Sequence, residues 1–177
     1  MTPFIPISRC FRRRARSVGI GGFTLVEIMV VVTIISLLAM LAVPTMQKIR
    51  RKARASAIAN DFRVFSTAFL TYSHENGAWP AESAAGVVPT GMEPYLKGGV
   101  WTRVSPMGGR YNWDNKQLHQ SGFTPRAAIA ITGTGDSPIL IDASQLAAID
   151  EALDDGDLTT GNFRLGSGNA PLFVIEP

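Results

Sequence analysis

The sequence FTLVEIMVVVTIISLLAMLAV, residues 23–43, decides the organisation of this chain. It is apolar throughout except for Thr24, Glu27, Thr33 and Ser36. Because an α-helix rises about 1.5 Å per residue, a helix of this length crosses the roughly 30 Å hydrocarbon core of a bilayer. The pattern therefore predicts a transmembrane helix over residues 23–43.

Two small residues, Gly21 and Gly22, precede the apolar stretch. A secretory signal is the alternative interpretation, but its apolar part is usually only about 7–15 residues long and its small residues follow that part. Both the length and the order differ here. The segment is therefore better explained as a membrane anchor.

The first 22 residues hold five of the 17 Lys and Arg residues, the only cysteine, Cys10, and no acidic residue. Basic flanks stay on the cytoplasmic side, so we expect a single-pass inner-membrane protein with a cytoplasmic N-terminus and a periplasmic C-terminal domain. Without this leader the chain carries 12 basic against 14 acidic residues, a formal charge of −2. The basic pI therefore does not indicate nucleic-acid binding, and the remainder has no cysteine for disulfides or metal ligation.

Glu27 stands only four residues inside the apolar span. A carboxylate in a membrane span is costly, so such residues pair with a partner or mark a function. The alternative is that Glu27 lies near the lipid headgroups and reaches water. Both interpretations remain open on the residue alone.

The run Gly22-Phe23-Thr24-Leu25-Val26-Glu27, a long apolar helix and Pro44 together resemble the class III signal of type IV pilins and type II secretion pseudopilins. This resemblance implies that a prepilin peptidase cleaves between Gly22 and Phe23 and methylates the new amine of Phe23. It also implies that Glu27 pairs with the Phe23 ammonium of a neighbouring subunit during filament assembly. We therefore expect Glu27→Ala or Glu27→Leu to keep cleavage but to lose incorporation into filaments.

Beyond the span, residues 44–76 continue as an amphipathic helix. Pro44 removes a helical hydrogen bond and predicts a kink or a locally melted turn around Leu41 to Pro44. An apolar stripe with mostly three- and four-residue spacing follows: Met46, Ile49, Ala53, Ile58, Phe62, Phe65, Phe69 and Tyr72. The opposite face carries Lys48, Arg50, Arg51, Lys52, Arg54 and Arg63. Gly77 is expected to cap the end of the helix, and Pro80 prevents its resumption.

Residues 77–177 form a small globular domain. Strand patterns occur at residues 100–104, 110–113, 127–132, 138–141 and 172–175, and a short amphipathic helix is predicted over 144–153. A sheet covering the aromatic stripe of the long helix gives an α+β fold. The phrase Asn76-Gly77-Ala78-Trp79-Pro80 resembles the turn after the long helix in major pseudopilins, so the body is most similar to that subclass.

Several residues are candidates for a binding site. Asp154, Asp155 and Asp157 supply oxygen ligands, and the resemblance to major pseudopilins implies a Ca²⁺ site in this part of the chain. The alternative is that these aspartates cap a helix or contact water, and their spacing is not that of an EF-hand. His74 and His119 are remote from each other, and no motif of a hydrolase or metalloprotease is present, so we expect no enzyme and no cofactor other than Ca²⁺.

The predicted function is that of a structural subunit polymerising into the pseudopilus of a type II secretion system, which exports proteins. The implied partners are further copies, other pseudopilins, the prepilin peptidase and an inner-membrane assembly platform. A type IV pilus subunit for adhesion or motility is one alternative. A competence pseudopilin that takes up DNA is another, since Trp79, Trp101, Tyr111 and Trp113 could stack on bases, although the charge of −2 favours packing in the core.

Overall fold

The computed structural model describes residues 22–96, 99–119 and 123–177, so the predictions on the basic leader and Cys10 lie outside the described residues. The chain forms, in order, α1 (Leu25–Asn76), β1 (Arg110–Asp114), β2 (Ala127–Thr132), α2 (Ala143–Leu153), β3 (Phe163–Leu165), a 3-10 turn (Ser167–Asn169) and β4 (Pro171–Glu176). The chain falls into two units, residues 1–42 and 43–177, and each is described by itself.

The described part of the first unit is the start of α1, and its side chains are exposed. This helix is long and apolar enough to cross a membrane. Its internal polar side chains bond back to their own helix: the Thr33 hydroxyl donates to the Met29 carbonyl at 2.8 Å, and the Ser36 hydroxyl donates to the Val32 carbonyl at 2.7 Å. These hydroxyls therefore need no external partner in an apolar environment.

Pro44 lies inside α1, and the residues from Leu41 to Pro44 are all helical. The alternative of a locally melted turn is therefore wrong for this structure. A proline within a helix displaces one hydrogen bond without ending the helix when the turns on both sides are intact. The kink at Pro44 stays a prediction.

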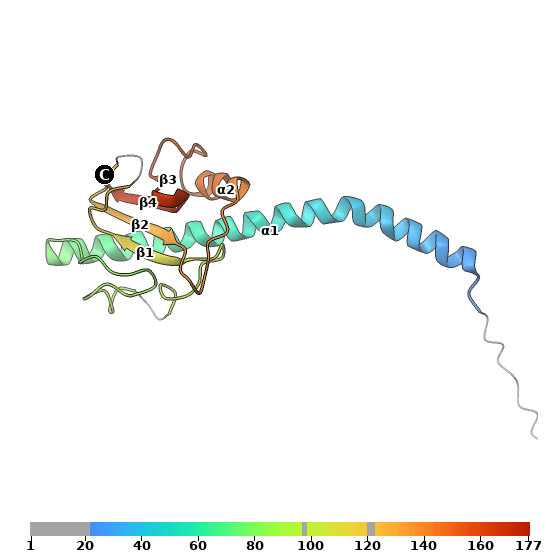
Figure 1. Ribbon diagram of the computed structural model, residues 1–177, viewed down its shortest axis with the longest axis horizontal. Coiled ribbons are helices and arrows are strands. Elements are labelled where there is room, and N and C mark those ends of the chain that lie inside the picture. The colour runs from blue at the N-terminus through green and yellow to red at the C-terminus, as the bar shows by residue number, and fades with distance from the viewer. Residues whose placement is uncertain (1–21, 97–98, 120–122) are drawn as a thin grey trace, which may run out of the picture. The chain divides into compact units, whose positions relative to one another are not determined.

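The second unit is built on a four-stranded antiparallel sheet with the strand order β1-β2-β4-β3. Tyr111 of β1 lies opposite Ile131 of β2, and Phe173 of β4 lies opposite both Ile129 of β2 and Phe163 of β3. Figure 1 shows the sheet lying along the C-terminal half of α1, with α2 at one end. This helix-on-sheet arrangement confirms the predicted α+β class.

The aromatic stripe of α1 and the facing side of the sheet form the core. Phe62 and Phe69 are fully buried, and the Phe69 ring stacks on Trp113 of β1 at 3.9 Å between centroids. Phe65 packs edge-on against Tyr111 at 4.8 Å. Burying each large apolar side chain contributes about 1.5–3 kcal/mol, so these contacts hold α1 on the sheet. The predicted core roles of Trp101, Tyr111 and Trp113 are confirmed by their burial.

The apolar stripe of α1 is shorter than predicted at its N-terminal end. Met46 and Ile49 are 52% and 57% exposed, and Ala53 is also exposed. Burial begins at Ala55, because the sheet and α2 cover only the later turns of the helix. The helix ends at Asn76 as predicted, and the Gly77 amide donates to the Ser73 carbonyl at 2.8 Å with a positive φ of 71° that suits glycine.

Two predicted strands are absent, and one strand was not predicted. Residues 100–104 form turns with a single bridge from Val104 to Arg110, and residues 138–141 pair with no strand. Leu140 is 72% exposed and makes one backbone bond to Met107, so it lacks the ladder that a strand needs. Strand β3, for which no strand was predicted, is only three residues long and is held by pairing with β4. The helix predicted over 144–153 is confirmed as α2.

A buried carboxylate ties α1 to the body at the level of the core. Asp61 is 6% exposed, and its Oδ2 accepts hydrogen bonds from the Tyr111 hydroxyl and from Arg103 Nη2, both at 2.5 Å. Burial, followed by the bond to Asp61, raises the pKa of Tyr111, so its hydroxyl stays a donor. An acid on an otherwise apolar helix face is therefore matched by one hydroxyl and one guanidinium.

Candidate assembly site

The residues predicted for processing and assembly lie around the start of α1: Gly22 and Phe23 precede the helix, and Glu27 lies in its first turn. The Glu27 amide donates to the Thr24 hydroxyl at 3.2 Å, and the Thr24 amide and hydroxyl both donate to Glu27 Oε2 at 3.0 Å. This reciprocal pattern is a capping box, which satisfies amide groups that have no partner in the first helical turn. The spacing Thr24-x-x-Glu27 is its sequence signature, and the sequence analysis did not use it.

The capping box gives Glu27 a structural role within its own chain. The bonds from Thr24 all reach the same oxygen, Oε2, and the side chain remains exposed. The carboxylate therefore keeps its charge and its other oxygen toward the surroundings. Capping and pairing with a second chain are compatible uses of one side chain.

The surroundings of this turn are apolar. Phe23 is 81% exposed and borders a shallow groove. The groove is lined by Phe23, Thr24, Leu25, Ile28, Met29, Val32 and Thr33. Glu27 is thus the acidic side chain of an exposed apolar helix end, where its carboxylate can attract a cation.

The three aspartates predicted to bind Ca²⁺ lie in the loop after α2, and their carboxylates bond within that loop. Asp154 Oδ2 accepts from the Asn162 amide, Asp155 accepts from the Asp157 amide at 3.0 Å, and Asp157 accepts from the Thr159 hydroxyl at 2.7 Å. Within the described residues no group of three or more Asp, Glu, His or Cys side chains could hold a metal ion. The three aspartates thus do not form a ready site in this conformation, and Ca²⁺ binding stays a prediction.

Asp150, on the last turns of α2, was missed by the sequence analysis. It is fully buried, and neither carboxylate oxygen has a hydrogen-bond partner among the described residues. Burial, with the nearby charges of Asp155, Asp154 and Asp157, raises its pKa to about 6. The sequence could have indicated this buried residue, because Asp150 is an acid on the apolar helix face that Leu146 and Ile149 define.

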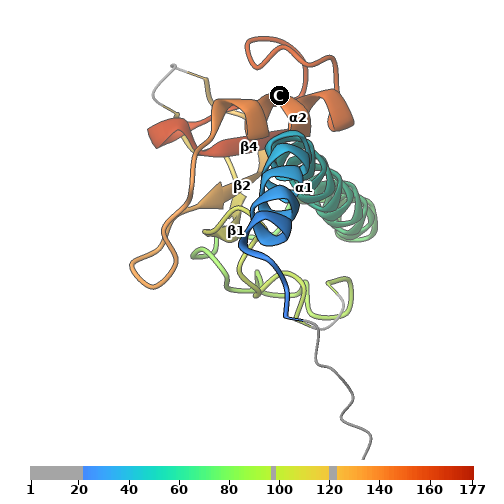
Figure 2. The same cartoon turned by 90° about the vertical axis from the view of Figure 1, so that its right-hand side faces the viewer.

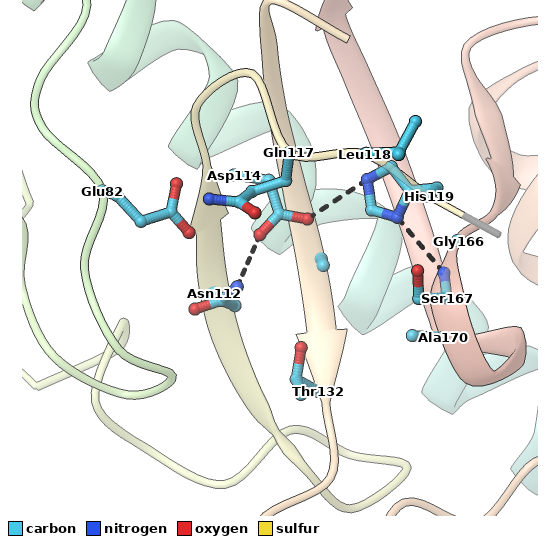
Figure 3. Close-up of a pocket in the computed structure, with 11 residues that line it drawn as sticks. Glu82, Asn112, Asp114, Gln117, Leu118, His119, Thr132, Gly166, Ser167 and Ala170 are labelled. Carbon is cyan, nitrogen blue, oxygen red and sulfur yellow. Dashed lines mark hydrogen bonds and ion pairs between the residues drawn. The ribbon is translucent and has the colours of Figure 1, made fainter. Parts of the chain in front are cut away.

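A polar pocket of about 230 Å³ lies on the sheet face that turns away from α1 (Figure 3). There His119 Nδ1 accepts a hydrogen bond from the Ser167 amide at 3.2 Å, which leaves the proton on Nε2, 3.5 Å from Asp114 Oδ2. Burial, with Glu82 as a second cause, raises the pKa of Asp114 to about 7, and burial lowers the pKa of His119. Because Ser167 contributes its backbone amide to His119, this pair does not form a nucleophile–base arrangement.

The two histidines lie in different environments. His74 is exposed at the end of α1, as predicted, whereas His119 is buried. The glycine-containing segment after β2 closes a tight turn through paired backbone bonds between Thr134 and Ser137, at 2.9 and 3.1 Å. These features describe a helix packed on a sheet, with a long apolar helix start that could cross a membrane and carries Glu27.

Comparison with known proteins gives related sequences of one kind, although no family model matches the chain. Fimbrial protein EcpC of Eikenella corrodens is 36% identical over 76 residues, 42% of this chain and 50% of that protein. The type II secretion system core protein G of Pseudomonas aeruginosa is 38% identical over 61 residues, covering 34% of this chain and 43% of its own length. The core protein G of Vibrio cholerae is 33% identical over 100 residues, covering 52% and 68%.

The chain therefore belongs to the family of type IV pilins and type II secretion pseudopilins. It spans about half the length of the first two relatives and about two thirds of the third. Among solved structures, the major type IV pilin PilA1 from Clostridium difficile has a TM-score of 0.48 and 17% identity, covering 72% of this chain and 97% of that chain.

Proposed function

We propose that this chain is a structural subunit of a type II secretion pseudopilus, which assembles after cleavage between Gly22 and Phe23 and methylation of Phe23. Membership of a family that includes two core G proteins supports the secretion system over other machines. The observation that carries the assembly mechanism is the exposed Glu27 charge at an apolar helix end. Its proposed partner is the Phe23 ammonium of the next subunit, because pairing relieves the cost of two charges in a poorly solvated setting.

The capping box provides a sharp test of this mechanism. Glutamine at position 27 can still accept a bond from Thr24 and complete a capping box, but it carries no charge. Glu27→Gln should therefore keep the helix end and the cleavage, yet lose incorporation into filaments. The matched control is Thr24→Val, which removes the hydroxyl of the box and keeps the carboxylate.

The experiment reconstitutes the secretion system and compares sheared filament yield with the amount of cleaved subunit in the membrane. We expect Glu27→Gln to give cleaved subunit without filaments and Thr24→Val to give filaments. A normal filament yield from Glu27→Gln, or from the Glu27→Leu variant, would show that the charge has no role in assembly. Loss of filaments only in Thr24→Val would mean that capping alone matters.

The proposed topology places residues 1–22 in the cytoplasm and the body, from residue 44 onward, in the periplasm of a single-pass inner-membrane protein. It rests on the basic leader and on the apolar helix. Further proposed partners are other pseudopilins, the prepilin peptidase and the assembly platform, and the role is that of a building block without catalysis. Protease added to spheroplasts should digest the body, and protection of the body would contradict this orientation.

The fimbrial relative favours one second candidate, a type IV pilus subunit. A competence pseudopilin would additionally bind DNA. DNA retention by the purified chain that weakens steeply as salt is raised would favour that function, because phosphate contacts release counterions. Deleting the gene and measuring protein export against surface piliation separates the secretion role from the pilus role.

A further inference from the structure

Five cations are concentrated in one short segment of α1. This basic segment, residues 48–54, contains Lys48, Arg50, Arg51, Lys52 and Arg54. Only Arg51 is partly buried. Among the described residues none of these cations lies within 4.0 Å of a carboxylate, since the four ion pairs present join other residues. Asp142 interacts electrostatically with Arg51, which leaves most of the positive charge unbalanced.

Three of the five cations line a groove between α1 and α2. Its walls are Pro44, Lys48, Arg51 and Lys52 from α1 and Ser144 and Ala148 from α2, and its volume is about 370 Å³. The Gln145 side chain donates to the Arg51 carbonyl at 3.4 Å, which holds α2 beside α1, as Figures 1 and 2 show. The Ser144 hydroxyl donates to Asp142 Oδ1 at 3.0 Å, so the donors that the groove offers are its three cations, which suit a phosphate group.

The position of the groove along the chain places it close to the end of the apolar span. Val43 is the last residue of that span, and α1 is continuous from Val43 to Lys48. Five helical residues cover about 7–8 Å, which is comparable to the thickness of the headgroup layer on one side of a bilayer. This step rests on the assignment of residues 23–43 as the membrane span.

We propose that this groove binds the headgroup phosphate of an anionic phospholipid in the membrane leaflet that faces the body. Lys48, Arg51 and Lys52 supply both the positive charge and the hydrogen-bond donors. Each basic residue near an anionic membrane surface contributes attraction, and the three cations that line the groove act together on one phosphate. Such binding fixes the depth at which the subunit sits before it is extracted into a filament.

The experiment uses the full chain in neutral detergent micelles, doped with rising mole fractions of phosphatidylglycerol or of zwitterionic phosphatidylcholine. Backbone amide NMR shifts of Ser144 and Ala148 report on the groove. The unaltered chain is compared with a groove variant (Lys48→Gln, Arg51→Gln and Lys52→Gln) and with a control variant (Arg50→Gln, Arg54→Gln and Lys116→Gln) that removes equal charge outside the groove lining.

We expect phosphatidylglycerol alone to shift both amides in a saturable way. Each cation should contribute roughly fivefold to the affinity for the lipid, so the groove variant should need on the order of 100-fold more phosphatidylglycerol for the same shift. The control variant should lose much less affinity. An exchange variant (Lys48→Arg, Arg51→Lys and Lys52→Arg) should retain binding. Equal losses in the groove and control variants would overturn the proposal in favour of general surface charge.

Equal shifts with the zwitterionic lipid would also overturn the proposal. Shifts that depend on protein concentration and not on phosphatidylglycerol would assign the groove to an acidic surface of a second copy, such as the loop with Asp154 and Asp155, and would equally overturn it. The readout does not require filament assembly, so it does not depend on the proposed function.

Discussion

Replacing Asp61 with alanine removes the carboxylate that joins α1 to β1 and to the segment before it. Its Oδ2 accepts bonds of 2.5 Å from the Tyr111 hydroxyl and from Arg103 Nη2. The two partners differ in environment, because Tyr111 is fully buried whereas the Arg103 side chain is 47% exposed. After the substitution, Arg103 can be hydrated by water, but the Tyr111 hydroxyl is left buried without its acceptor.

The expected loss of stability for each variant follows from this difference in burial between Tyr111 and Arg103. A hydrogen bond to a charged group contributes about 1.5–3 kcal/mol, so Tyr111→Phe should lower the free energy of unfolding by that amount. A half-exposed ion pair contributes about 0–1 kcal/mol after solvent screening, so Arg103→Gln should cost less than about 1 kcal/mol. Asp61→Ala loses both interactions and should cost about 2–4 kcal/mol.

The assay is urea unfolding of the full chain in mild non-ionic detergent, followed by the fluorescence of the buried Trp101 and Trp113. The double variant Asp61→Ala with Tyr111→Phe completes a thermodynamic cycle. It should cost little more than Asp61→Ala alone, because a phenylalanine at position 111 needs no acceptor. The slope of free energy against urea should stay constant across the set.

Two results would refute this reasoning. Additive costs of Asp61→Ala and Tyr111→Phe would show that their hydrogen bond contributes nothing to stability. A cost of Arg103→Gln equal to that of Asp61→Ala would show that the ion pair, and not the buried hydroxyl, is the main contribution.

Three further predictions concern the body of the protein. Gly108→Ala should lower stability by at least about 2 kcal/mol in thermal unfolding, because the φ of Gly108 is 82° and an added Cβ would lie 2.3 Å from the Pro138 carbonyl oxygen. The control Gly135→Ala should be neutral, because a Cβ there meets nothing within 4 Å. Asp114 has a pKa raised to about 7, so it stays protonated in the folded chain at pH values where it ionises in the unfolded chain. Stability should therefore fall as pH rises from about 4 to about 7, by up to about 1.4 kcal/mol per pH unit, and Asp114→Asn should flatten this dependence of stability on pH. An unchanged slope would contradict the assignment. If Ca²⁺ binds near the end of α2, calorimetry should show heat and a thermal shift that the double substitution Asp155→Asn and Asp157→Asn abolishes. Absence of both in the unaltered chain would remove the calcium hypothesis.

Periodic patterns of adequate length could be interpreted from the sequence alone. The long helix α1 and strand β2 follow from runs whose hydrophobic pattern matches a single type of element. Strand β3 could not be found in this way, because three residues carry no period and its formation depends on pairing with β4. Residues 138–141 show the reverse error, since strand-like residues there have no neighbouring strand to pair with.

The residues of interest that were not predicted from the sequence are mainly buried polar ones. Asp61 and Asp150 each stand within an apolar helix face, and that position was a readable signal of a buried acid. Their partners were not readable, because Tyr111 lies 50 residues from Asp61 in the sequence. The pairing of Asp114 with His119 likewise depends on how the segment after β1 folds back over the sheet.

The central claim, that the chain is a processed filament subunit, is tested most directly by intact-mass spectrometry of the membrane-extracted protein, produced with and without a co-expressed prepilin peptidase. The account predicts a peptidase-dependent chain that begins at Phe23 and carries the mass of one added methyl group. A chain that stays uncleaved with the peptidase present, or one that is cut after the apolar segment, would contradict it and would assign residues 23–43 to an ordinary anchor or secretory signal.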